Sequence, residues 1–120
     1  MPFFIKVKGS FHGKHYWPGA PECFAELGVL HEHDFGFVVE IMEEHPREIE
    51  FLLFAQEINE KLASHLQANP YLSCEEMARD LFRWLDAGRL VPPPVLPGRV
   101  ASVEVNEDGD CGAIYQKGEV

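Results

Sequence analysis

The sequence predicts an α+β fold, with a four-stranded antiparallel sheet and two helices packed on one of its faces. Two long segments of alternating apolar and polar residues come first, two segments with helical spacing follow, and two shorter alternating segments come last. Strands and helices that are segregated along a chain in this way are typical of α+β domains. The 120 residues have the length of one domain, so residues 1–120 are predicted to form a single ββααββ unit.

The first two predicted strands are long and are separated by a loop. In residues 3–15 apolar and polar side chains alternate, and Gly9 leaves open whether the strand is regular or carries a bulge at that glycine. Residues 16–30 contain two prolines and two glycines, among them Pro18, Gly19 and Pro21, which predict a long loop. Residues 31–43, HEHDFGFVVEIME, alternate again and include aromatic and β-branched members, so they predict the second strand.

Two helices are predicted next. In residues 49–66 apolar side chains recur three or four positions apart, which indicates an amphipathic helix. Its expected buried stripe consists of Phe51, Phe54, Ala55, Ile58, Leu62 and Leu66. Ser73 and Glu76 have the spacing of a capping box, in which each side chain bonds to the other residue's backbone, so a second helix is predicted to begin there. Its expected buried residues are Met77, Leu81 and Leu85.

The remaining segment predicts a connector and a hairpin. Residues 88–98 hold four of the nine prolines and are expected to be a connector. Residues 99–107 alternate as a third strand, Asp108-Gly109 predicts a two-residue hairpin turn, and residues 110–117 return as a fourth strand. Such a sheet has two open edges, which must be covered or paired. We therefore expect a homo-oligomer in which symmetry extends the sheet.

Composition excludes several classes of protein. A chain with 46% apolar and 25% charged residues is globular, and it has no run of about 18 apolar residues that could span a membrane. The formal net charge of −10 argues against a nucleic-acid partner. No secretory signal pattern stands at the N-terminus, and Cys23, Cys74 and Cys111 are odd in number and widely spaced. These features predict free thiols and a cytoplasmic location.

Histidines in the first two predicted strands suggest a metal site. Side chains two apart in a strand share a face, so His31 and His33 point the same way. His15 shares its face with Phe11, whereas His12 points to the other face. If the two strands pair as a hairpin, three histidines meet and leave a fourth position open, which is the ligand set of a catalytic zinc. The same spacing also fits a solvated polar face, so spacing alone leaves both interpretations open.

Four segments in order resemble the 6-pyruvoyl-tetrahydropterin synthase family, which includes the 6-carboxy-tetrahydropterin synthases of queuosine biosynthesis. FHGKH (11–15) resembles Phe-x-Ala-x-His, and HEHDF (31–35) resembles His-Gly-His-Asn-Tyr. NPYLSCEEMA (69–78) resembles Asn-Pro-Thr-Ser-Glu-Asn-x-Ala and is two residues longer. VEVNEDGDCGAIY (103–115) resembles the closing strand pair of the family. Together these segments span most of the chain.

The resemblance implies a T-fold, in which sheets join across subunits into a barrel, commonly a hexamer of two trimers with active sites at subunit interfaces. It implies a zinc ion at His15, His31 and His33. It also implies that Glu107 anchors the pterin ring, since a carboxylate matches paired N–H donors. The activity implied is that of a lyase acting on 7,8-dihydroneopterin triphosphate or a close analogue.

The residues that would move protons depart from the family pattern. The family's catalytic cysteine lies four to six residues before His-x-His, whereas Cys23 lies eight before His31 and Glu26 lies five before it. One branch of the family uses a glutamate there, so Cys23 and Glu26 are rival candidates for the base. His65 is the candidate for the family's Asp–His pair, but Ser64 precedes it.

A triphosphate substrate also requires cations at the pocket. Lys6, Lys8, Lys14 and Arg99 are the candidates for this task, although the net charge of −10 gives no long-range attraction. Three hypotheses therefore stay open: a zinc-dependent pterin lyase, a pterin- or purine-binding T-fold homologue without the standard activity, and a metal-free oligomeric protein with bystander histidines.

Overall fold

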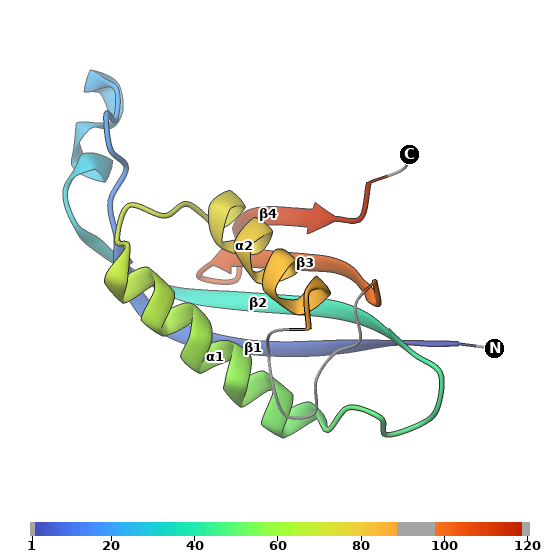
Figure 1. Cartoon of the computed structure of the whole chain (residues 1–120). Coiled ribbons are helices and arrows are strands. Elements are labelled where there is room, and N and C mark those ends of the chain that lie inside the picture. The colour runs from blue at the N-terminus through green and yellow to red at the C-terminus, as the bar shows by residue number, and fades with distance from the viewer. Residues whose placement is uncertain (1, 89–97, 119–120) are drawn as a thin grey trace.

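The structure, a computed structural model, describes residues 2–88 and 98–118 (Figure 1). Its elements are β1 (Phe3–His15), the 3-10 helix η1 (Glu22–Gly28), β2 (His31–Glu43), α1 (Phe51–Ala68), α2 (Cys74–Asp86), β3 (Val100–Glu107) and β4 (Cys111–Gln116). The strands form one antiparallel sheet in the order β1-β2-β3-β4. The predicted α+β class and ββααββ order are confirmed. The segment predicted as a loop between the first two strands contains η1.

The hairpin of β1 and β2 is regular along its whole length. Its register runs from Phe3 opposite Glu43 to His15 opposite His31 without a shift, so no bulge lies at Gly9. A Cβ atom at Gly9 would lie 2.5 Å from the Phe37 ring, so the glycine makes room for an aromatic side chain of the neighbouring strand. The irregularity in the sheet instead occurs where β2 pairs with β3, between Glu40 and Ile41.

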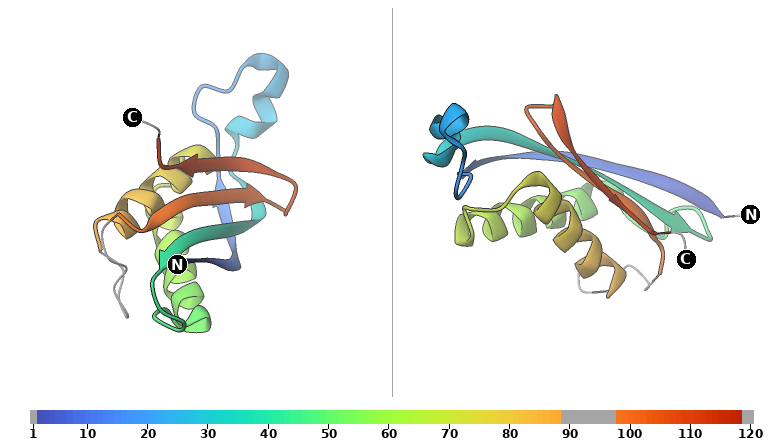
Figure 2. Two further views of the ribbon diagram at one scale, coloured as in Figure 1. Left: turned by 90° about the vertical axis from the view of Figure 1, so that its right-hand side faces the viewer. Right: turned by 90° about the horizontal axis from the view of Figure 1, so that it is seen from above.

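Both helices pack on the same face of the sheet, as predicted (Figure 2). Helix α1 lies against β1, and α2 lies against β3 and β4. The residues of α1 that are buried are Phe54, Ile58, Leu62 and Leu66. Phe51, which the spacing placed on this stripe, is the first residue of the helix and is 53% exposed. The helical faces and the alternate residues of the strands enclose one apolar core.

Helix α2 begins where the sequence predicts. The Ser73 hydroxyl accepts a hydrogen bond from the Glu76 amide at 3.1 Å, and the Glu76 carboxylate accepts one from the Ser73 amide at 3.2 Å. The capping box stops the helix from starting earlier and makes Cys74 its first residue. Cys74 is buried there, and the predicted stripe of Met77, Leu81 and Leu85 is buried as well.

The turn between β3 and β4 differs from the prediction by one residue. Asp108 and Gly109 both have positive φ, 55° and 74°, and the Asp110 amide donates to the Glu107 carbonyl at 3.0 Å. These are features of a tight hairpin turn at Asp-Gly. Glu107, however, lies opposite Cys111, so the connection has three residues rather than two.

The ends of the sheet order define its edges. Strands β1 and β4 each have one neighbour, so each has an open edge. The proline-rich connector predicted for residues 88–98 lies outside the described residues between Gly88 and Gly98. In the described ranges, no helix combines the length and the apolar character that crossing a membrane requires.

Replacing Gly112 by alanine is expected to destabilise the protein. Gly112 lies opposite Asn106, and a Cβ atom there would lie 2.5 Å from the Asn106 Cα atom, a backbone contact that cannot yield. We expect Gly112→Ala to lower the free energy of unfolding by about 3 kcal/mol. Urea denaturation measures this, with Gly28→Ala as the control, since its Cβ atom meets Ala20 at an ordinary 3.6 Å. Equal midpoints for both variants would contradict the β3–β4 pairing.

Candidate metal centre

Three histidine side chains converge at the end of the β1–β2 hairpin. His15 lies directly opposite His31, and His33 lies opposite Gly13, so the register brings the three rings to one face of the sheet. Their ring centroids are 4.6–5.2 Å apart. One ring nitrogen of each lies within 4.8 Å of the others, so the group could hold a metal ion. The pairing and strand parity expected from the sequence are confirmed.

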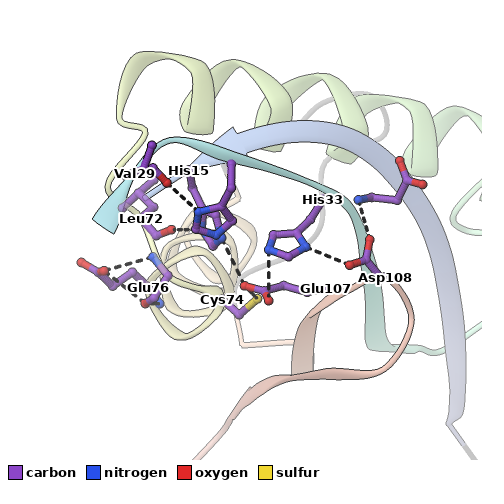
Figure 3. A network of polar contacts seen from close by, with 11 residues as sticks. His15, Val29, His33, Leu72, Cys74, Glu76, Glu107 and Asp108 are labelled. Atoms are coloured by element: carbon purple, nitrogen blue, oxygen red, sulfur yellow. Dashed lines mark hydrogen bonds and ion pairs between the residues drawn. The ribbon is translucent and has the colours of Figure 1, made fainter. Parts of the chain in front are cut away.

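Backbone carbonyls orient two of these rings. The Nδ1 atom of His15 donates to the Leu72 carbonyl at 3.0 Å, and that of His31 donates to the Val29 carbonyl at 2.8 Å (Figure 3). A carbonyl oxygen only accepts hydrogen bonds, so Nδ1 must carry the proton in both rings. In each neutral imidazole the Nε2 lone pair is then free to bind a metal.

An aspartate orients the third ring. The Nδ1 atom of His33 lies 2.8 Å from the Asp108 Oδ2 atom, and the other oxygen of that carboxylate accepts from the Asp34 amide at 2.9 Å. The hydrogen bond from His33 is the largest cause that lowers the pKa of Asp108 from its ordinary value, followed by the bond from Asp34. Asp108 was predicted only as a turn residue. Its side chain is therefore a part of the site that the sequence analysis missed.

The Glu107 carboxylate faces two of the imidazoles. Its oxygens lie 3.3 Å from Nε2 of His15 and 3.5 Å from Nε2 of His33. Carboxylate oxygens and unprotonated Nε2 atoms are all acceptors, so a cation between them, either protons or a metal ion, is needed to hold them together. Imidazole nitrogens and a carboxylate are ligands that zinc prefers, so the three histidines, with Glu107 beside them, would fit a zinc ion.

Cys74 is a second residue of the site that the sequence analysis missed. Its sulfur lies 3.9 Å from the Glu107 Oε1 atom, and the side chain is buried at the start of α2. Burial, and next the charge of Glu107, raise the pKa of this thiol to about 12. Cys74 is therefore a neutral donor towards Glu107 near pH 7. The signal that could have pointed to it is its position directly after the Ser73 cap, inside a segment of the family resemblance.

The histidines open into a cavity of about 790 Å³, a size that suits a small molecule. It is lined by His15, Tyr16, Trp17, Pro18, Leu27, His31, His33, Tyr71, Leu72, Ser73, Cys74, Glu75, Glu76, Glu107, Cys111 and Gly112. The lining contains aromatic and apolar side chains, carboxylates and two cysteines besides the imidazoles. Such a lining combines a flat apolar contact surface with a few polar groups that orient a ligand.

The basic residues considered for a phosphate group do not line this cavity. Lys6, Lys8 and Lys14 are exposed residues of β1, of the opposite parity to His15, so they point away from the helices. Lys14 lies 3.4 Å from Glu32, and Arg99 pairs with Glu48 at 3.0 Å. In the part of the chain that the structure describes, no lysine or arginine contributes to the lining.

The two candidate bases, Cys23 and Glu26, lie on η1, which is the short light-blue helix between β1 and β2 in Figure 1. Cys23 and Glu26 are both exposed residues of this short helix. Neither is among the residues that line the cavity, although Leu27 of the same helix is. The structure therefore brings together the three histidines and Glu107 but not these two side chains.

His65 forms a pair that the sequence did not show. Its Nε2 atom lies 2.9 Å from the Asp80 Oδ2 atom, and its ring packs against Trp84 with centroids 4.7 Å apart. The family pattern places an aspartate directly before the histidine, whereas here the aspartate comes from α2. The pair links α1 to α2 and lies outside the cavity lining.

Replacing His65 by alanine is expected to weaken the protein without changing metal binding. The substitution removes a half-buried hydrogen bond between the two helices, so we expect the free energy of unfolding to fall by about 1 kcal/mol. Urea denaturation and a zinc titration measure the two effects, with the exposed His45→Ala as control. Loss of zinc affinity in His65→Ala alone would show that the pair acts on the metal centre.

Fold and site together define an α+β protein with a candidate three-histidine metal centre. Comparison of the chain with models of known protein families and with curated proteins gives no match. The function is therefore inferred from the residues of the site.

Proposed function

We propose that this protein is a zinc-dependent pterin enzyme with a T-fold, resembling 6-pyruvoyl-tetrahydropterin synthase and acting on 7,8-dihydroneopterin triphosphate or a close analogue. The observation that carries the proposal is the convergence of His15, His31 and His33, each with Nδ1 occupied by an acceptor. An imidazole held in this way presents Nε2 to a metal ion. The adjoining cavity has room for a pterin.

Each residue of the site has a separate role in this proposal. His15, His31 and His33 would hold the zinc ion, which when bound supplies a Lewis acid for the oxygens of the substrate side chain. The Glu107 carboxylate lies beside the Nε2 atoms of His15 and His33. With a cation bound between these groups, Glu107 would accept hydrogen bonds from the N–H groups of the pterin edge. The Cys74 thiol donates to that carboxylate and keeps it oriented.

Cys23, Glu26 and His65 remain the candidates for proton transfer. None of them lines the cavity of its own chain. In the T-fold that the resemblance implies, active sites lie between subunits, so Cys23 and Glu26 would act in the cavity of a neighbouring subunit, whereas His65 is held between the helices by Asp80. Exposed Cys23 and Glu26 are available for such a contact, and a proton-transfer group must come within hydrogen-bond reach of the substrate.

An oligomer is part of the proposal. The open edges of β1 and β4 can pair with neighbouring subunits and extend the sheet into a barrel. Large apolar side chains are exposed on both edge strands, among them Phe4 at 67% and Ile114 at 62%. Their burial between subunits would stabilise a trimer or hexamer.

A second candidate function is a pterin- or purine-binding T-fold homologue that lacks the standard synthase reaction. The cavity favours it in one respect, since Glu75, Glu76 and Glu107 line it while Lys6 and Lys14 point elsewhere. Carboxylates at the mouth of a cavity repel a triphosphate. An uncharged pterin or purine does not meet this repulsion.

Metal analysis and one incubation distinguish the candidates. Purified protein is expected to contain, or to take up, one zinc ion per chain. Absence of both would exclude the enzyme and leave an oligomeric protein with bystander histidines. Zinc-loaded protein is then incubated with dihydroneopterin triphosphate, and pterin products are detected by fluorescence after oxidation. A new product supports the enzyme, whereas binding without turnover supports the homologue that lacks the standard reaction.

A further inference from the structure

We propose that Asp108 is a positioning residue of the metal centre, which holds His33 in the tautomer and orientation that present Nε2 to the metal ion. The inference rests on the proposed metal centre and adds to it a residue that does not touch the metal. The ion would be bound by an imidazole whose other nitrogen donates to a carboxylate. In metal sites of this kind such a carboxylate sets the ligand's tautomer and raises its basicity.

The Asp108 carboxylate is held at both of its oxygens. Oδ2 accepts from Nδ1 of His33 at 2.8 Å, and Oδ1 accepts from the Asp34 amide at 2.9 Å. The Asp108 amide in turn donates to the Asp34 carbonyl at 2.7 Å. Asp34 of β2 therefore holds both the backbone and the carboxylate of Asp108 in place. The carboxylate, held in this way, can orient the ring of His33, the residue next to Asp34.

The turn explains why this carboxylate points back towards β2. Asp108 has a φ of 55°, a left-handed conformation that few residues other than glycine, asparagine and aspartate adopt readily. Directly after the end of β3, this conformation aims the side chain at the adjacent strand rather than along β4. An Asp-Gly pair therefore serves two purposes here, since it closes the hairpin and supplies the acceptor for His33.

His33 is the one member of the cluster whose Nδ1 atom has an anionic acceptor. The Nδ1 atoms of His15 and His31 donate to backbone carbonyls, which no side-chain substitution removes. The Asp108 side chain is 51% exposed, so solvent screens its charge. The direction of the hydrogen bond, and with it the tautomer of His33, therefore matters more than the charge.

A substitution that keeps the shape of the side chain and changes its hydrogen bonding tests this role, so the variant is Asp108→Asn. Asparagine tolerates a positive φ and has nearly the shape of aspartate. Its side chain has one acceptor and one NH₂ group, whereas the Asp34 amide and Nδ1 of His33 both require an acceptor. If the oxygen faces Asp34, the NH₂ group faces Nδ1 and selects the tautomer with the proton on Nε2. That proton occupies the position of the metal ion.

Zinc affinity is measured by competition with a chromogenic chelator. We expect Asp108→Asn to bind zinc about 10–100-fold more weakly than the unmodified protein. The control is Asp110→Asn, which makes the same change of charge two residues away in the same turn. Unmodified protein that binds no zinc would overturn both the proposed function and this inference. Equal affinity of Asp108→Asn and Asp110→Asn overturns the inference alone and leaves the metal centre in place.

NMR spectroscopy of the unmodified protein tests the inference even if the Asp108→Asn variant does not fold. In ¹H–¹⁵N spectra of the zinc-loaded protein, His33 is expected to show a protected Nδ1–H proton with the downfield shift of a hydrogen bond to a carboxylate. That signal should move upfield or vanish in Asp108→Asn and stay unchanged in Asp110→Asn. A merely structural role of Asp108 would not change the tautomer. Absence of a protected Nδ1–H signal in the unmodified protein overturns the inference.

Discussion

The double variant His31→Ala/His33→Ala is expected to lose zinc binding. It removes two of the three imidazoles and leaves His15 as a single ligand, which cannot hold zinc at micromolar concentration. Zinc at a hundred times its dissociation constant should stabilise the unmodified protein by about 2.7 kcal/mol, since it binds the folded state. Calorimetry with and without a chelator should therefore show a melting temperature that depends on zinc in the unmodified protein and not in the variant.

The matched control removes two histidines outside the cluster, in His12→Ala/His45→Ala. His12 lies on the opposite face of β1, where its Nδ1 atom donates to Asp34 at 2.9 Å, and His45 is exposed after β2. The control is expected to keep its zinc-dependent melting temperature. If both double variants respond to zinc like the unmodified protein, the ion binds elsewhere and the three-histidine centre is wrong.

The variant Glu107→Gln is expected to bind zinc like the unmodified protein and to bind pterin more weakly. A carboxylate can accept from both N–H groups of a pterin edge, whereas the glutamine amide places a donor opposite one of them. Loss of a hydrogen bond to a charged group at a half-buried position costs about 1.5–3 kcal/mol, which corresponds to a dissociation constant roughly 10–150-fold higher. Binding can be followed through the fluorescence of Trp17, which lines the cavity.

Glu75→Gln is the control for this variant, since Glu75 also lines the cavity and its substitution makes the same change of charge. It is expected to bind an uncharged pterin, without phosphate groups, like the unmodified protein. A Glu107→Gln variant that binds pterin normally would contradict the anchor. If it loses zinc and keeps pterin, the carboxylate that faces His15 and His33 is a metal ligand instead.

The fold was largely predictable because its signals are local. Alternation over a few residues indicated four strands, and a spacing of three or four indicated two helices, with the capping box marking the start of α2 at the correct residue. Two details needed the structure. The sequence left a bulge at Gly9 open, and the regular pairing of β1 with β2 and the nearby ring of Phe37 decide against it. The turn after Glu107 has three residues rather than the predicted two, because Glu107 pairs with Cys111.

The site was predictable only in part, for the same reason. Strand parity was enough to select His15, His31 and His33 and to set His12 aside, because side chains of a strand alternate between its faces. Asp108 and Cys74 were missed as site residues. Asp108 is 75 positions from His33, and Cys74 is 33 positions from Glu107, so no pattern of spacing relates them.

By itself, the sequence determined the α+β class, the order of the elements and the identity of the three histidines, all of which follow from the periodicity of side chains along a strand or a helix. Only the tertiary structure decided what each histidine donates to, that Glu107 faces two of them, and that Lys6, Lys8 and Lys14 point away from the cavity. These contacts depend on how strands and helices pack across long separations in the chain. Periodicity describes which face a residue occupies, and packing decides what lies opposite that face.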